Sequence, residues 1–172
     1  MKNLVLVGFM GTGKTVVGQR AAARLGHRFV DTDQRIEQRA GRTITELFAT
    51  EGEARFRQRE RAVIQELAAQ QNLVIATGGG VVLNPDNLRD LEASGVVICL
   101  WAEPAVILQR TRQHTHRPLL HGPDPARRIA ELLAERAPFY GAIAHRVDTS
   151  HTTVEENVED VLTIYRHQTT GA

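Results

Sequence analysis

Short hydrophobic runs alternate with longer amphipathic stretches along the whole chain. Continuous apolar runs occupy residues 4–7, 73–76 and 96–100, and weaker runs occupy residues 28–30 and 146–147. Runs of this length are typical of strands in a parallel sheet, because helices cover both faces of such a sheet. The five runs therefore predict a three-layer α/β fold, in which a central parallel sheet of five strands lies between helices on both faces.

A capping pattern and two glycines mark the expected ends of helices. Gly26 follows a stretch with helical spacing and is predicted to end that helix. Thr43 and Glu46 have the spacing of a capping box, so they are predicted to open a short helix through residue 49, which Gly52 ends. A longer helix is expected over residues 53–70.

A glycine-rich segment follows the first predicted strand directly. Residues 8–15 match the phosphate-binding pattern G-x-x-x-x-G-K-[ST] at every required position. Glycines let backbone N–H groups turn toward phosphate oxygens, and the following helix offers its positive end. Lys14 is expected to reach the β and γ phosphates, and the Thr15 hydroxyl to bind Mg²⁺. A Rossmann dinucleotide site is disfavoured, because Val16 stands where its third glycine would be.

Composition limits what else the chain can be. A length of 172 residues with 42% hydrophobic content suits one domain over residues 1–172. The formal net charge of +1 gives no general attraction to nucleic acid or to an anionic membrane. The single cysteine, Cys99, lies in an apolar run and is expected to be a buried thiol. We therefore expect a cytoplasmic protein with neither nucleic acid nor membrane as a partner.

Two aspartates stand at the predicted carboxyl end of the second strand, an edge where open α/β sheets place ligand groups. If the strand continues, Asp31 and Asp33 point the same way, so that one could hold Mg²⁺ through water and the other could accept a hydrogen bond from an attacking hydroxyl. Asp31 is the stronger metal candidate, because no later apolar strand is predicted to end in Asp. Capping of a helix by Asp33 stays open as an alternative.

Three successive glycines, Gly78, Gly79 and Gly80, follow the third predicted strand at the same edge of the sheet. They indicate either a close approach of the backbone to a ligand or a flexible turn. Arg57 and Arg136 lie in stretches otherwise suited to packing, although a single arginine is usually a solvated surface group.

The order of these motifs resembles that of the shikimate kinases. The likeness rests on the phosphate loop and on the pair of aspartates, and it spans nearly the whole chain. It continues through Gly41-Arg42-Thr43-Ile44, Gly52-Glu53-x-x-Phe56-Arg57-x-x-Glu60, Gly78-Gly79-Gly80, Arg117-Pro118-Leu119-Leu120 and Arg136-x-Pro138-x-Tyr140. The resemblance implies a monomeric enzyme with a nucleoside-monophosphate-kinase-like fold. It also implies transfer of the γ-phosphoryl group of ATP to the 3-hydroxyl of shikimate, with one Mg²⁺ ion, in aromatic amino-acid biosynthesis.

The same resemblance implies the roles of the substrate residues. Asp33 is expected to bind the attacking hydroxyl of shikimate, and Arg57 and Arg136 to hold its carboxylate. Gly79 and Gly80 are expected to meet the ring hydroxyls through backbone N–H groups. A small anionic polyol does require arginines for its carboxylate and a carboxylate for its hydroxyls.

On the nucleotide side, the resemblance implies that Asp31 joins Thr15 around Mg²⁺. Residues 113–125, which are polar and hold three prolines, are expected to form a mobile lid whose Arg117 closes over ATP. Arg110 is expected beside the adenine. The implied ATP-binding residues are Gly11, Thr12, Gly13, Lys14, Thr15, Val16, Arg110 and Arg117, and the implied catalytic residues are Lys14, Asp33 and Arg117.

Two other functions remain open at this point. A gluconate kinase would share the phosphate loop and the sheet, but it gives no reason for Arg57, Gly79 and Arg136 together. A regulatory nucleotide-binding module is disfavoured, because the chain lacks an N-K-x-D guanine motif. One departure from the family pattern also stands out, since Val154 replaces the proline of a usual T-P-E-E sequence near the expected adenine loop.

Overall fold

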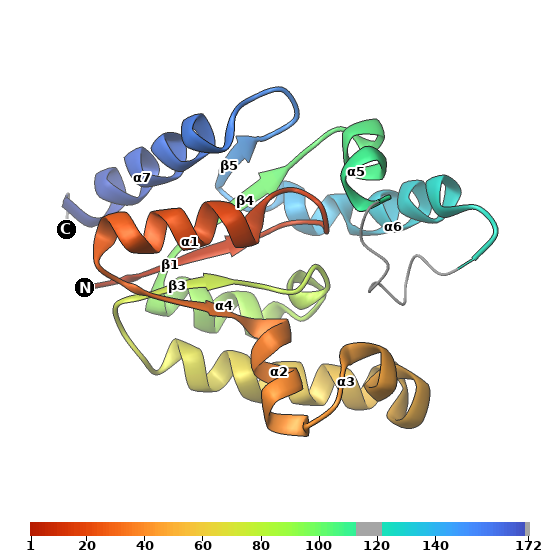
Figure 1. The fold of residues 1–172 in the computed structure, drawn as a ribbon. Coiled ribbons are helices and arrows are strands. Elements are labelled where there is room, and N and C mark those ends of the chain that lie inside the picture. Colours follow the sequence, from red (N-terminus) through yellow and green to blue (C-terminus); the bar gives the residue numbers. More distant parts are fainter. Residues whose placement is uncertain (113–121, 171–172) are drawn as a thin grey trace.

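Five parallel strands form the centre of the computed structural model, which describes residues 1–112 and 122–170 (Figure 1). They are β1 (Asn3–Val7), β2 (Arg28–Asp31), β3 (Leu73–Ala76), β4 (Gly95–Trp101) and β5 (His145–Asp148). Their order across the sheet is β2-β3-β1-β4-β5, and every pairing is parallel. The predicted parallel α/β sheet is confirmed.

Helices connect the strands and cover the sheet on both faces. They are α1 (Lys14–Leu25), α2 (Thr32–Ala40), α3 (Ile44–Ala68), α4 (Pro85–Ser94), α5 (Pro104–Thr111), α6 (Pro125–Gly141) and α7 (Val154–Thr170), with a short 3-10 helix η1 (Val81–Leu83). In Figure 1, α1 and α7 lie on one side of the sheet, and α2, α3 and α4 lie on the other. The fold is thus three-layered, as predicted.

The central strand β1 contributes to two separate cores. Leu4 and Leu6 pack with apolar side chains of α1 and α7, whereas Val5 and Val7 pack with those of α3, α4 and α6. All four residues are fully buried. Since successive strand side chains point to opposite faces, burial on both faces requires an uninterrupted apolar run. This burial explains why β1, β3 and β4 were visible in the sequence.

The helix ends follow the predicted signals. Thr43 and Glu46 form the expected capping box, in which Thr43 N donates to Glu46 Oε2 at 2.8 Å and Glu46 N to Thr43 Oγ1 at 3.2 Å. Gly26 ends α1 in the left-handed region, with φ 66°. Gly52 (φ 80°, ψ 172°) is non-helical and divides α3 into two helical segments, as predicted.

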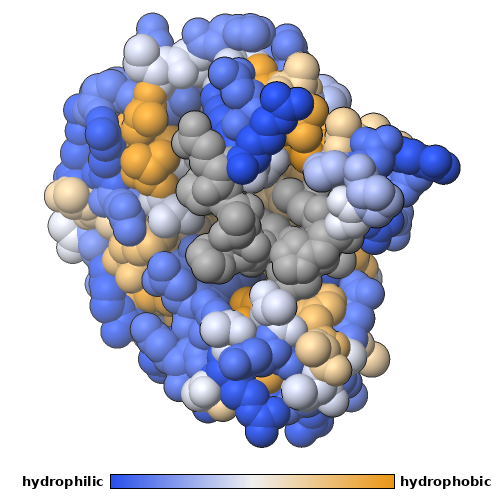
Figure 2. All heavy atoms as spheres, turned by 45° about the vertical axis from the view of Figure 1, so that its right-hand side comes forward, coloured by the Kyte–Doolittle hydropathy of each residue, from blue (hydrophilic) through white to orange (hydrophobic). Residues whose placement is uncertain are grey.

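The carboxyl ends of the strands gather at one edge of the sheet, on the right in Figure 1. Figure 2 brings this side forward and shows mainly hydrophilic residues, with hydrophobic ones in small separate patches. The predicted lid over residues 113–125 lies largely outside the described residues. Its last residue, Pro125, is also the first residue of α6, and Asp124 caps this helix by accepting a hydrogen bond from Arg127 N. Among the described residues, no helix is long and apolar enough to cross a membrane.

Candidate active site

The phosphate loop leaves β1 at Gly8 and enters α1 at Lys14. At Gly8 (φ 143°) a Cβ would lie 2.2 Å from the carbonyl oxygen of Leu100, so no side chain fits. Gly13, with φ 99°, directly precedes α1 and has a conformation that favours glycine. The backbone conformation therefore requires glycine at both positions, and the binding of phosphate by this loop stays a prediction.

The Lys14 ammonium lies inside the loop. Its Nζ donates to the carbonyl oxygens of Gly8 and Phe9, both at 2.7 Å, and the side chain is buried. Thr12, also buried, donates from Oγ1 to Phe9 O at 2.8 Å. The loop therefore holds a cation at the N-terminus of α1, where backbone N–H groups already favour an anion.

Arg110 joins the phosphate loop to the segment that follows β5. Its Nη1 donates to Gly11 O and to Thr149 Oγ1, both at 3.1 Å. The Thr149 hydroxyl in turn donates to Thr12 O at 2.8 Å. Arg110 thus lies beside the phosphate loop, and its place beside the adenine stays a prediction. Thr149 was not predicted, and its only sequence signal is that it follows a strand at the same edge of the sheet.

Thr15 and Asp31 lie side by side where the phosphate loop passes into α1. Thr15 Oγ1 donates to Asp31 Oδ2 at 3.4 Å. Mg²⁺ takes one or two protein oxygens and completes its shell with phosphate and water, so this hydroxyl and carboxylate suit it. The described residues contain no group of three or more His, Cys, Asp or Glu that could hold a metal without such help.

Three expectations about the aspartates are corrected. The strand does not continue to Asp33, because β2 ends at Asp31 and α2 begins at Thr32. Asp31, rather than Asp33, is the N-cap of α2, and its Oδ1 accepts the backbone N–H groups of Asp33 and Gln34 at 2.9 and 3.1 Å. A strand end in Asp also occurs later, at Asp148.

The carboxylate of Asp148 has a different setting from that of Asp31. Its Oδ1 accepts the Ser150 backbone N–H at 2.9 Å, which stabilises the turn after β5. The contact with Thr15, and not the place at a strand end, therefore distinguishes Asp31 as the metal candidate.

A second cluster surrounds the glycine turn 78–80, which follows β3. A Cβ built on each glycine would come within 3.0 Å of a charged side chain: Asp33 Oδ1 at Gly78, Arg136 Nη1 at Gly79 and Arg57 Nη1 at Gly80. A hydrogen bond also holds the turn against the start of α2, because Gly78 N donates to the buried Thr32 Oγ1 at 2.9 Å. The glycines are thus required by close approach, and the approaching groups are the predicted substrate residues.

Glu60 lies within this charged cluster. It is 1% exposed, and Arg57 Nη1 donates to its two oxygens at 3.0 and 3.1 Å. Burial raises the pKa of Glu60 to about 7, although the Arg57 charge opposes the rise; the Asp33 carboxylate adds to it. Arg57 itself is 25% exposed and therefore presents part of its guanidinium outward.

Arg136 reaches the turn from α6. It is 3% exposed, and its guanidinium lies 5.7 Å from the centroid of the Phe9 ring. Tyr140, one helical turn further on, donates from its hydroxyl to Gly79 O at 2.7 Å. No role for Glu60 or Tyr140 was predicted. Their signal was spacing, since residues three or four positions after an arginine share its helix face.

Val154 stands where the shikimate kinases usually have the proline of T-P-E-E, and the start of α7 explains why valine fits there. Thr153 and Glu156 form a capping box at the start of α7, with N–H to carboxylate and N–H to hydroxyl distances of 2.7 and 3.2 Å. Val154 is the first residue of α7, a position where proline is favoured, and its side chain packs against the α1–α7 core. Valine therefore keeps the helix start that the usual proline would provide.

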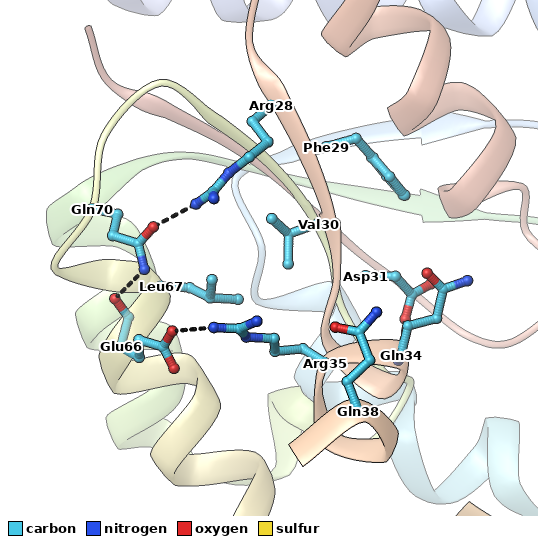
Figure 3. A pocket seen from close by; sticks show the side chains of 10 residues that line it. All are labelled: Arg28, Phe29, Val30, Asp31, Gln34, Arg35, Gln38, Glu66, Leu67 and Gln70. Atoms are coloured by element: carbon cyan, nitrogen blue, oxygen red, sulfur yellow. Dashed lines mark hydrogen bonds and ion pairs between the residues drawn. The ribbon is translucent and has the colours of Figure 1, made fainter. Parts of the chain in front are cut away.

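A cavity of about 250 Å³ opens beside the edge strand β2 (Figure 3). Across it, Arg28 Nη2 donates to Gln70 Oε1 at 2.6 Å, and Arg35 pairs with Glu66 at 2.9 Å. Among its lining residues only Asp31 belongs to the predicted site. The cavity therefore adjoins the nucleotide cluster only at Asp31 and has no lining residue from the cluster around the glycine turn.

Comparison with known proteins agrees with this arrangement. Residues 10–166 match the family model of shikimate kinase. A shikimate kinase of Pelotomaculum thermopropionicum is 48% identical over 162 residues, which cover 94% of each chain. The chain belongs to the shikimate kinase family. A solved shikimate kinase of Acinetobacter baumannii in complex with shikimate matches with a TM-score of 0.93 and 36% identity, covering 98% of this chain and 95% of that one.

Membership of the shikimate kinase family decides between the functions that the sequence left open. The enzyme transfers the γ-phosphoryl group of ATP to the 3-hydroxyl of shikimate and forms shikimate 3-phosphate and ADP. A gluconokinase of Sinorhizobium meliloti matches with a TM-score of 0.67 but only 19% identity, which shows a shared fold alone. The gluconate kinase and the regulatory module are therefore not supported.

Proposed function

We propose that the two clusters divide the work of this shikimate kinase between nucleotide and acceptor. On the nucleotide side, the backbone N–H groups of the loop bind the phosphates and Lys14 neutralises charge on the transferred group. Arg110 stands between the loop and the adenine. The proposed ATP-binding residues are Gly11, Thr12, Gly13, Lys14, Thr15, Val16, Arg110 and Arg117.

On the acceptor side, Arg57 and Arg136 bind the shikimate carboxylate, and Asp33 accepts a hydrogen bond from the attacking hydroxyl. Two guanidiniums suit a carboxylate because each presents parallel N–H donors in one plane. The burial of Arg136 strengthens this interaction, since little water competes for it. Gly79 and Gly80 contribute backbone N–H donors to the ring hydroxyls.

The Thr15 hydroxyl and the Asp31 carboxylate would hold Mg²⁺ with ATP. The support is their 3.4 Å contact beside the phosphate loop. The ion supplies positive charge that offsets the negative charge of the phosphate oxygens. Asp31 keeps its second oxygen in the N-cap of α2, so the protein fixes the orientation of this carboxylate without any metal.

The lid, the monomeric state and the location of the protein are predicted without structural evidence. Arg117 lies in the segment that the structure does not describe, so its catalytic role and the closure of a lid stay predictions. The monomeric state and the cytoplasmic location also stay predictions from the sequence. Size-exclusion chromatography with light scattering would test the monomer.

One observation carries the proposal: Asp33 of α2, Arg57 of α3 and Arg136 of α6 meet at a single glycine turn. The test is shikimate-dependent ADP release in Arg57→Ala and Arg136→Ala. We expect the KM for shikimate to rise steeply, with about 2 to 5 kcal/mol lost from kcat/KM, while the KM for ATP changes little.

Arg89→Ala is the matched control, because Arg89 on α4 is 69% exposed and pairs only with surface carboxylates among the contacts found. It should behave like the wild type. Equal damage to ATP and shikimate use in the Arg57 and Arg136 variants would contradict the division between the clusters.

A further inference from the structure

The hydroxyl of Tyr140 contacts the glycine turn at its most crowded point. It donates to Gly79 O at 2.7 Å, and Tyr140 is buried. A Cβ on Gly79 would lie 2.9 Å from Arg136 Nη1 and 3.6 Å from the Tyr140 hydroxyl. Both side chains therefore lie next to the Cα of Gly79. Tyr140 follows Arg136 by four residues, which places the two on one face of α6.

Holding the Gly79 carbonyl has a consequence for the next residue. The peptide unit between Gly79 and Gly80 is planar and trans, so its C=O and its N–H point in opposite directions. A donor that fixes the carbonyl therefore also fixes the direction of the Gly80 N–H. Glycine on both sides of this peptide would otherwise allow it to rotate, because glycine has more backbone freedom than any other residue.

Burial keeps the Tyr140 hydroxyl protonated, so that it remains a hydrogen-bond donor. Burial raises the pKa of Tyr140 to about 12, against the opposing charge of Arg136. The phenol therefore stays protonated at neutral pH. Arg136 is in turn bordered by the Phe9 ring at 5.7 Å, so its guanidinium is confined between the phosphate loop and α6.

We infer that Tyr140 is a positioning residue for shikimate: its hydroxyl fixes the Gly79–Gly80 peptide and borders Arg136, so that one helix face aligns a backbone donor and a guanidinium toward the same ligand. The inference rests on the proposed roles of Gly80 and Arg136. It assigns Tyr140 no contact with the reacting atoms. Loss of the hydroxyl should therefore weaken shikimate binding more than it slows the transfer step.

The test compares Tyr140→Phe with Tyr165→Phe. Both tyrosines are buried, and the Tyr165 hydroxyl also donates to a backbone carbonyl, that of Lys2 at 2.6 Å, at the opposite edge of the sheet. Each variant loses a buried hydroxyl that donates to a backbone carbonyl, and Tyr165→Phe also loses a contact with His27 Nε2 at 3.2 Å. Steady-state kinetics with each substrate, titration calorimetry with shikimate and thermal melting are measured for both.

We expect Tyr140→Phe to raise the KM and the Kd for shikimate by about five- to twentyfold, with kcat and the KM for ATP changed less than about twofold. Tyr165→Phe should melt at a lower temperature but keep wild-type constants. The inference is overturned if Tyr140→Phe shows only the melting effect, if it raises both KM values alike, or if it fails to fold, since each result makes the hydroxyl a structural group.

Arg136→Ala separates this inference from the proposed function. If Arg136→Ala raises the KM for shikimate and Tyr140→Phe does not, the positioning role is wrong and the site assignment stands. If Arg136→Ala leaves the KM for shikimate unchanged, the site assignment itself is wrong, and the role of Tyr140 falls with it.

Discussion

The phosphate loop and the glycine turn 78–80 are both built from glycines after a parallel strand, yet they are organised in opposite ways. The loop is one continuous segment whose cation, Lys14, comes from its own residues and folds back on its own carbonyl oxygens. The turn contributes little charge itself, and its charged groups arrive from α2, α3 and α6. In the proposed function, phosphate, a general ligand, is thus bound by local backbone, and shikimate, a specific one, by converging side chains.

This difference determines how each region should respond to mutation. Loss of a loop residue removes an interaction with the transferred group itself, so it should lower kcat. Loss of a residue around the turn should act mainly through shikimate binding, and its size should follow how deeply that residue is buried. The following predictions test this contrast, beginning with the largest expected effect.

Lys14→Ala should lose nearly all phosphoryl transfer, by about 10²- to 10³-fold or more in kcat, because the ammonium offsets charge that develops in the transition state. ADP release at saturating ATP and shikimate measures this loss. Circular dichroism serves as the control for folding. Turnover close to that of the wild type would show that the loop does not act as proposed.

The two aspartates should separate in a Mg²⁺ titration. Asp33→Asn should keep Mg·ATP binding but lose most of its turnover, because the amide lacks the negative charge that favours a partly deprotonated hydroxyl. Asp31→Asn should instead need more Mg²⁺, and excess Mg²⁺ should restore part of its activity. If added Mg²⁺ rescues Asp33→Asn and not Asp31→Asn, the two roles must be exchanged.

The sequence predicted the local features of the fold better than the distributed ones. The runs at β1, β3 and β4 and the capping box at Thr43 were visible because burial on both faces and capping act over a few residues. The shift of the N-cap from Asp33 to Asp31 was not, because it depends on where β2 ends against β3.

The candidate site shows the same limit. The loop was predicted from its own spacing. Arg57 and Arg136 were singled out because they lie in stretches suited to packing, but only the resemblance gave them a role in binding substrate. Thr149 was not assigned a role, because its contact with Thr12 joins segments that are distant in the chain. Glu60 contacts Arg57 only three residues away, so spacing could have shown this pair, but its burial beside the turn depends on helix packing.

Glu60 predicts a pH dependence of stability around the turn. Its pKa is raised from an ordinary value of 4.5 to about 7, so between these values the folded state holds a proton that the unfolded state has lost. Its contribution to stability is therefore full below pH 4.5 and is lost as the pH rises through about 7. A shift of this size corresponds to at most about 3 kcal/mol.

Glu60→Gln removes this titration while it keeps the shape of the side chain. Urea unfolding of the wild type and the variant at several values between about pH 5 and pH 8 measures the difference in the free energy of unfolding. We expect the wild type to lose stability relative to the variant as the pH rises. A difference that stays constant over this range would mean that Glu60 is already ionised in the folded protein.

The smallest expected effect concerns the hydrogen bonds that join the phosphate loop to Thr149, just after β5. Thr149→Val keeps the shape of the buried side chain but removes the hydroxyl that donates to Thr12 O and accepts from Arg110. A buried hydrogen bond contributes about 1 kcal/mol, so the KM for ATP should rise by about threefold to tenfold, with the KM for shikimate unchanged. Thr152→Val is the control, because Thr152 lies just beyond, is exposed, and bonds only to Asp148 O and Asn157 among the described contacts. If Thr149→Val raised the KM for shikimate as much as that for ATP, the two clusters would be mechanically coupled, and the contrast between a self-contained loop and a converging turn would have to be given up.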